Sequence, residues 1–209
     1  MKFDLTNFDQ KRSEILNATF QTIYEQGIVE MSMRSIARAA RVNQSTVHYY
    51  FQSKENLLNA FIRALFDRFL FEIERRFLKS DSPEKKLEAI IDAGKDFAGK
   101  QEELFVVFID CWSLAIRNPA MKKTFSDLYV RMTKLFEDII EEGIQAGLFN
   151  QVRKDILSVM LLSFVGGMGM QWHMRKRSFD VRKHFSVLTE NLRMMIIKQR
   201  KTDSVRYTL

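Results

Sequence analysis

The stretch MRSIARAARVNQSTVHYYFQSKENLL, residues 33–58, decides the fold of the first part of the chain. Ser32 precedes a short segment with apolar residues at helical spacing, and Asn43 precedes a second such segment. Serine and asparagine are favoured at these positions because their side chains accept hydrogen bonds from the free N–H groups at a helix start. Two short helices separated by a few residues predict a helix-turn-helix unit.

Helical spacing of apolar residues continues on both sides of this unit. Upstream, Asp9 is placed to cap a helix and Gly27 to end it, while downstream Ser53 opens a long amphipathic helix. Pro83 and Pro119 stand where helices begin, because a missing N–H costs nothing at the first helical position. Further helices are expected at about 83–99, 102–117, 119–146, 155–174 and 180–201. The predicted fold is all-α, with an N-terminal three-helix helix-turn-helix head (residues 1–53) and a larger helical body (54–209).

The composition of the 209 residues is that of a globular protein, with 46% hydrophobic and 28% charged residues, so disorder is not expected. The single Cys111 and the lack of a charged-then-apolar leader predict a cytoplasmic protein. Residues 156–172 carry no charge and approach the length of a membrane span. Their serines, glycines and glutamine favour a buried interface helix over a spanning one.

The net charge of +7 suggests a nucleic-acid partner, but its distribution weakens that inference. Residues 1–171 hold 23 basic and 23 acidic side chains, whereas residues 172–209 hold 10 and 3. For the basic segment 172–209 a solvated helix end is favoured over a second contact with DNA or membrane, although its role stays open, and no membrane partner is predicted. A DNA-binding function must therefore rest on a motif.

Residues 33–58 strongly resemble the DNA-binding signature of the TetR/AcrR family, and the resemblance is sharp over residues 11–58. The shared pattern is Ile-Ala, a small residue, a turn, Val-Ser/Asn, Thr, an aromatic pair ending in Tyr-Phe, and Lys-Glu-x-Leu. Arg41 replaces the usual turn glycine, so it must adopt a left-handed conformation or shift the turn. His48 replaces the usual first tyrosine. The resemblance implies a homodimeric transcriptional repressor that binds a palindromic double-stranded operator and is released by a small-molecule effector.

The second short helix is the predicted recognition helix, because its first residues are small or polar and can approach base edges. Gln44 can pair with adenine, and Thr46 can contact a thymine methyl group or a phosphate. Helix starts near Ser35 and Lys54 favour phosphate. The alternative is that Gln44 only caps the turn and that Lys54 is solvated. The candidate DNA-binding residues are Arg34, Ser35, Gln44, Ser45, Thr46, His48, Tyr49 and Lys54.

The body is rich in Phe, Met and Trp, which predicts either a packed core or a pocket for a small, largely apolar effector. Asp110 suits a lipophilic cation, whereas Arg117 and Arg131 suit an acidic head group, and both chemistries stay open. The resemblance favours a pocket, since TetR-like bodies surround one. The candidate ligand-binding residues are Phe105, Phe108, Ile109, Trp112, Met132, Phe136, Phe164, Met168 and Trp172.

Residues 157–171 and 185–196 resemble the dimerising helices of the family, and two copies would form a four-helix interface. Gly166, Gly167 and Gly169 would allow close approach across the two-fold axis. A competing function is a TetR-like DNA-binding protein with a filled body, either gated by a protein partner or acting architecturally. An enzyme is not expected: the three histidines and one cysteine form no metal-ligand cluster, and no phosphate loop or nucleophile elbow occurs. Neither a cofactor nor a metal is predicted.

Overall fold

The structure is a computed structural model that describes residues 10–77, 82–176 and 178–197. These residues form helices joined by short connections, together with one isolated bridge between Phe149 and Ile197. The all-α prediction is confirmed. The helices are α1 (Gln10–Glu30), α2 (Met33–Ala39), α3 (Gln44–Phe51), α4 (Lys54–Phe77), α5 (Pro83–Gly99), α6 (Glu102–Ala115), α7 (Pro119–Gln145), α8 (Lys154–Arg175) and α9 (Val181–Ile196).

Side-chain caps form at the two predicted helix starts that carry a proline. Ser82 accepts a hydrogen bond from the N–H of Lys85 and precedes Pro83, and Asn118 in the same way precedes Pro119 at the start of α7. Asn43 stands at the cap position of α3 but makes no side-chain cap hydrogen bond. The predicted cap Asp9 and the predicted helix end at 201 lie outside the described residues.

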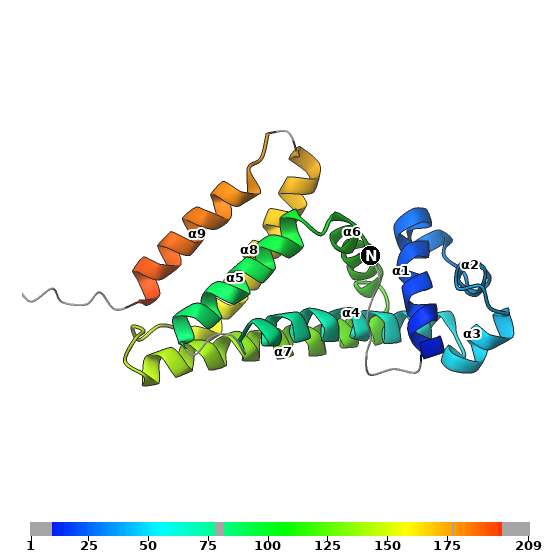
Figure 1. Ribbon diagram of the computed structural model, residues 1–209, viewed down its shortest axis with the longest axis horizontal. Coiled ribbons are helices and arrows are strands. Elements are labelled where there is room, and N and C mark those ends of the chain that lie inside the picture. Colours follow the sequence, from blue (N-terminus) through cyan, green and yellow to red (C-terminus); the bar gives the residue numbers. More distant parts are fainter. Residues whose placement is uncertain (1–9, 78–81, 177, 198–209) are drawn as a thin grey trace, which may run out of the picture.

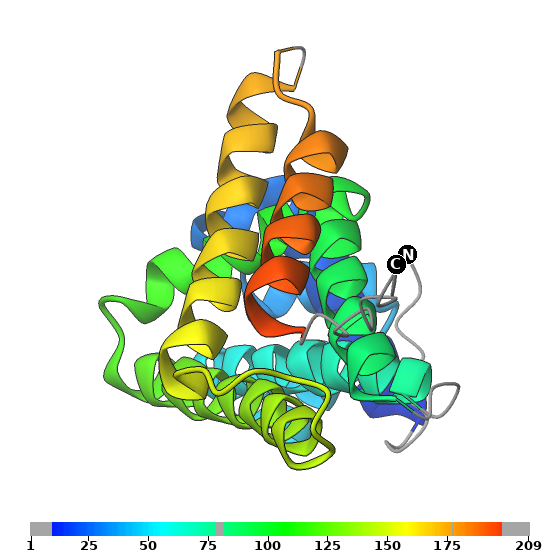
Figure 2. The same ribbon diagram turned by 90° about the vertical axis from the view of Figure 1, so that its left-hand side faces the viewer.

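The helices are arranged with the predicted head at one end and α9 at the other, while α8 crosses behind α5 between them (Figure 1). The long helices α4 and α7 pack against each other between these ends, and α5 packs on α4, α7, α8 and α9. Figure 2 shows α8 and α9 side by side on the face turned away from α1–α3. Helix α6 packs on α1, so the body reaches the head through α6 as well as through α4.

Gly27 interrupts α1 where the sequence predicts that it ends the helix. Its backbone has φ 79° and ψ 157°, and the chain then makes one more turn to Glu30. A positive φ of this size is open to glycine at little cost. The break places the N–H of Ile28 outside the regular helical pattern, where it is 3.3 Å from Oδ2 of Asp110 in α6.

Candidate functional site

The start of α2 is held by a reciprocal cap between two serines. The N–H of Ser35 donates to Oγ of Ser32 at 3.1 Å, and the N–H of Ser32 donates to Oγ of Ser35 at 2.9 Å. This is a capping box, which satisfies donors that a helix start otherwise leaves free. Ser35 is buried, whereas Arg34 beside it is exposed. Of these two DNA-binding candidates, the structure therefore leaves only Arg34 with its side chain at the surface.

The turn between α2 and α3 is closed by Arg41 in a left-handed conformation. Its φ is 55°, and the next N–H, that of Val42, donates to the carbonyl of Ala37 at 2.9 Å. A non-glycine residue in this region carries a cost on the order of 1 kcal/mol, which the surrounding packing must offset. Of the two alternatives that the missing glycine predicts, the structure has the left-handed one.

Helix α3 buries one side and exposes the other. Val47 and Phe51 are buried in the head, while Gln44, Ser45, His48 and Tyr49 are exposed and Thr46 is half-buried. Nε2 of Gln44 lies 3.4 Å from Nε2 of His48, whose Nδ1 lies 3.2 Å from the carbonyl of Gln52. The exposed side thus presents polar side chains along two turns of one short helix. This is the form of surface that enters a major groove.

Lys54 ties the start of α4 to the end of α1. Its ammonium lies 3.4 Å from the carbonyl of Ile28 and 3.5 Å from that of Val29, and it also donates to the carbonyl of Met31. The last carbonyls of a helix have no partner within the helix, and a cation there also interacts favourably with the helix dipole. Lys54 therefore stabilises the head as well as being a candidate for phosphate contact, and this structural role was missed from the sequence.

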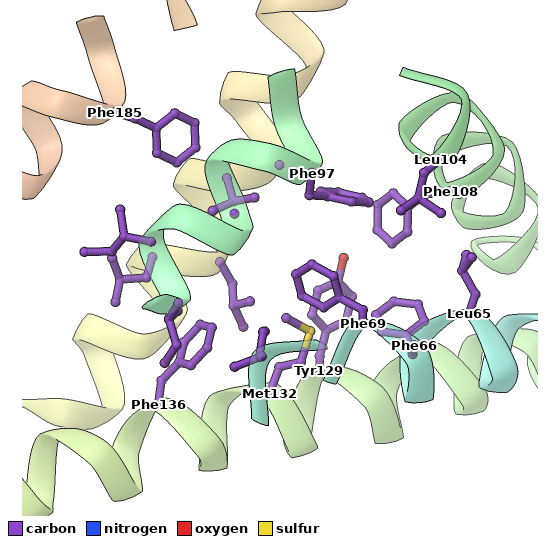
Figure 3. A pocket seen from close by; sticks show the side chains of 18 of the residues that line it. Leu65, Phe66, Phe69, Phe97, Leu104, Phe108, Tyr129, Met132, Phe136 and Phe185 are labelled. Atoms are coloured by element: carbon purple, nitrogen blue, oxygen red, sulfur yellow. The ribbon is translucent and has the colours of Figure 1, made fainter. Parts of the chain in front are cut away.

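A cavity of about 100 Å³ lies among α4, α5, α6, α7, α8 and α9 (Figure 3). Its wall is almost wholly apolar, and Tyr129 supplies the one polar side-chain group among the lining residues described. Apolar cavities with few polar groups are the usual form of small-molecule sites. The aromatic side chains of the wall are Phe66, Phe69, Phe97, Phe108, Tyr129, Phe136 and Phe185.

Three of the nine ligand-binding candidates, Phe108, Met132 and Phe136, line this cavity. The other six lie beside it or farther away. Phe105 stacks on His173 with ring centroids 4.4 Å apart, and Trp112 lines an outer groove between α6 and α7. Ile109, Phe164, Met168 and Trp172 lie on α6 and α8 outside the cavity wall.

The cavity wall contains aromatic residues that the sequence reading missed: Phe66, Phe69, Phe97, Tyr129 and Phe185. The first two lie on α4, in a helix that the sequence identifies only as amphipathic. The concentration of phenylalanine in α4 was the available signal. It does not reveal which of these rings face a cavity, because that depends on how α4, α5 and α7 pack.

The three charged residues considered for an effector head group do not line the cavity. Asp110 faces the break in α1, and Arg131 of α7 forms an ion pair with Asp67 of α4 at 2.8 Å. Arg117 is exposed just beyond the end of α6. Within the described part of the chain, no group of three His, Cys, Asp or Glu side chains is placed to hold a metal ion.

Two family models match the chain. Residues 15–61 match the bacterial regulatory proteins of the TetR family, and residues 83–196 match the BetI-type transcriptional repressor C-terminal region. The second match alone covers more than half of the chain. This chain belongs to the TetR family. The family is one of transcriptional regulators, not of enzymes.

Curated relatives of this TetR-family chain carry the name HTH-type transcriptional regulator BetI. The protein from Ectopseudomonas mendocina is 29% identical over 115 residues, which are 54% of this chain and 59% of that protein. The one from Stenotrophomonas maltophilia is 29% identical over 114 residues, 54% of this chain and 58% of that protein. The chain thus spans somewhat more than half the length of the curated relatives it matches.

Solved structures share the fold of this TetR-family chain over nearly their whole length. A TetR regulator from Haloarcula marismortui has a TM-score of 0.82 at 23% identity, covering 90% of this chain and 100% of that one. A transcriptional regulator from Saccharomonospora viridis in complex with choline has a TM-score of 0.79 at 21% identity, with 90% and 98% coverage. FadR from Bacillus subtilis in complex with stearoyl-CoA has a TM-score of 0.74 at 19% identity, with 86% and 96% coverage.

Proposed function

We propose that this TetR-family regulator is a cytoplasmic repressor whose head, residues 1–53, binds a palindromic operator and whose body, residues 54–209, binds a small, largely apolar effector. The observation that carries the proposal is the apolar cavity, whose wall includes parts of α4 and α6, the two helices that reach the head. The exposed polar side of α3 would enter the major groove. Two-fold symmetry requires the two heads to lie about one helical turn, ~34 Å, apart.

The active form is a homodimer assembled through α8 and α9. Their surfaces carry large apolar side chains that a soluble monomer would leave in water. Helix α8 is also long and apolar enough to cross a membrane, with only 28% of its most apolar stretch buried. Pairing with a second copy would cover this face without a membrane. The exposed residues are Ile156, Val159, Met160, Met170 and Met174 on α8, and Val187, Met194 and Met195 on α9.

Light scattering at micromolar protein concentration tests the assembly. A dimer mass is expected, since the exposed apolar side chains of α8 and α9 would then be buried between two copies. A monomer mass would overturn this part of the proposal. Partitioning of the protein into lipid vesicles would instead support the spanning alternative for α8.

The effector acts by changing the separation of the two heads. Filling a cavity in a closely packed interior shifts neighbouring helices as rigid bodies instead of deforming them smoothly. A displacement of α4 or α6 would swing the head that both helices contact. The effector then favours a dimer form that fits the operator poorly, and its differential affinity for the two forms sets the size of the response.

The experiment is a selection of bound sequences from genomic DNA, followed by a screen for small molecules that release the recovered operator. Release is expected to accompany a change in tryptophan fluorescence, because Trp112 lies beside Tyr129 of the cavity wall. A Trp172→Phe background isolates the Trp112 signal. Operator binding that no small molecule relieves, with unchanged Trp112 fluorescence, would overturn the effector proposal and favour gating by a protein partner.

A further inference from the structure

The hydroxyl group of Tyr129 is the one polar side-chain group among the described residues that line the cavity. Figure 3 shows its oxygen directed toward the rings of Phe97 and Phe108, within the ring of aromatic side chains. Tyr129 also lines the outer groove together with Trp112 and Val130. The tyrosine ring thus stands between the cavity and the groove, with a polar group in an otherwise apolar wall.

We propose that Tyr129 anchors the effector through its hydroxyl, and that the effector is an uncharged, mostly apolar molecule with one hydrogen-bond acceptor such as a ketone, ester or ether oxygen. The inference rests on the proposed function, because it assigns the chemistry of the ligand for the same cavity. It adds two things that the apolar wall alone does not specify: the residue that positions the ligand, and the chemical class of that ligand.

The hydroxyl is available as a donor. Partial burial raises the pKa of Tyr129, which keeps 37% of its surface exposed, and a hydrogen bond from Trp112 opposes this only in part, so the phenol stays protonated at neutral pH. An indole N–H can only donate, so the Tyr129 oxygen is the acceptor in that contact. The phenolic hydrogen is left to donate to a ligand. An acceptor oxygen on the effector is the group that complements it.

A charged effector does not suit this cavity. Among the described residues, no charged side chain lines it, and two charged residues considered from the sequence are engaged elsewhere: Asp110 with the N–H of Ile28, and Arg131 with Asp67. A charge brought into an apolar cavity without a partner loses its hydration and gains no counter-charge. A carboxylate finds no counter-charge here, and a quaternary ammonium group, which aromatic faces can attract, offers no acceptor to the Tyr129 hydroxyl. A neutral oxygen complements this wall best.

The test uses the full chain and four probes that share a phenyl ring: acetophenone, ethylbenzene, benzyltrimethylammonium and benzoate. Affinities are measured by calorimetry for the wild type, for Tyr129→Phe and for Tyr24→Phe. Tyr24 is the control because it has nearly the same exposed fraction as Tyr129, 38% against 37%, but lies on α1 and does not line the cavity. Tyr129→Phe is expected to weaken acetophenone binding about 2- to 10-fold, the effect of one lost hydrogen bond, and to leave ethylbenzene unchanged. The control should bind all probes as the wild type does.

Three outcomes would count against the proposal in distinguishable ways. Equal effects of Tyr129→Phe on acetophenone and ethylbenzene would overturn the anchoring role and leave the cavity as an effector site. Tightest binding of benzyltrimethylammonium or benzoate would overturn the uncharged ligand class. Failure of all four probes to bind a folded wild-type protein would overturn both the anchoring role and the ligand class, whereas the release screen decides the effector function separately.

Discussion

The carboxylate of Asp110 in α6 accepts a hydrogen bond from the backbone N–H of Ile28 in α1, with Oδ2 3.3 Å from the nitrogen. The contact lies directly after the break at Gly27 and joins the body to the head. Helix α6 also contributes Leu104 and Phe108 to the cavity wall. A displacement of α6 by an effector would therefore act on α1 through this hydrogen bond, in addition to any movement of α4.

Replacement of Asp110 by alanine is expected to weaken the effector response while leaving operator affinity within about threefold of the wild type. Loss of one hydrogen bond is worth about 0.5–1.5 kcal/mol, so the effector-induced change in operator affinity should fall about 2- to 10-fold. Fluorescence anisotropy with labelled operator measures both quantities. Asp110→Asn is the matched control, since its amide oxygen can still accept from Ile28. A full response in Asp110→Ala would exclude this contact from the coupling.

The exposed position of Gln44 on α3 predicts a change of DNA specificity when its side chain is removed. Gln44→Ala is expected to lose about 1–3 kcal/mol of discrimination at one base pair of each half-site. Lys54→Ala is the comparison, because a phosphate contact would be lost equally for all sequences and α1 would lose its C-terminal cation. Selection of bound sequences from a randomised DNA library measures the sequence preference and the relative affinity of each variant. Unchanged affinity and an unchanged selected sequence for Gln44→Ala would show that α3 is wrongly placed on DNA.

Gly169 and Gly167 lie on the same helix but in different surroundings. A Cβ at Gly169 would clash with the ring of Phe105 in the same chain, whereas nothing lies within 4 Å of a Cβ at Gly167. Gly169→Ala is expected to cost about 1–3 kcal/mol of folding free energy. Gly167→Ala should stabilise the isolated chain by up to about 1 kcal/mol through helix propensity.

Urea unfolding measures the stabilities of these two variants, and sedimentation equilibrium measures their dimerisation. A weaker dimer in Gly167→Ala would place this glycine in the interface between copies. Equal stability of Gly169→Ala and the wild type would mean that Phe105 does not pack against this glycine as the structure has it.

Asp96 of α5 forms an ion pair with Arg76 of α4, and we expect its contribution to folding stability to depend on pH. Burial raises its pKa, but hydrogen bonds from Lys100 and Arg76 outweigh this, so the net pKa is below the ordinary 3.8. Folding therefore favours the ionised carboxylate, and the contribution is complete above about pH 4 and disappears as the pH falls through the lower, folded-state value.

Asp96→Asn should accordingly be less stable than the wild type at pH 7, by up to about 1 kcal/mol, and the difference should shrink toward pH 2. Thermal unfolding across this pH range measures it. Asp127→Asn, which removes an exposed ion pair with Lys123, serves as control and should change stability little at any pH. If the stability difference between Asp96→Asn and the wild type grew on acidification, the ionised Asp96 carboxylate would not be the stabilising form.

The sequence predicts most of the fold because its signals are local. Pro83 and Pro119 follow capping residues at the starts of α5 and α7, and the cap at Ser32 marks α2. A capping hydrogen bond joins residues three apart, so a pattern in the sequence is enough to find it. The resemblance to the TetR family adds the order and spacing of the head helices, and the family match confirms that assignment.

The cavity and the links to the head could not be predicted in the same way. The ammonium of Lys54 donates to the carbonyls of Ile28 and Val29, and the carboxylate of Asp110 accepts from the N–H of Ile28. Both contacts join residues that are far apart in the sequence. Gly169 was read as a contact point between two copies, whereas the structure packs it against Phe105 of its own chain. Such pairings are set by helix packing, which one sequence does not specify.

The central claim is that occupancy of the cavity and operator binding by α3 are coupled, and coupling between two binding sites is reciprocal. The most direct measurement therefore uses the effector recovered from the release screen and determines two pairs of affinities. The first pair is operator affinity with and without effector, and the second is effector affinity with and without operator. We predict that each ligand weakens the other by the same factor, about 5- to 150-fold, and that Asp110→Ala lowers both factors together. Operator affinity that stays the same at saturating effector would contradict the account.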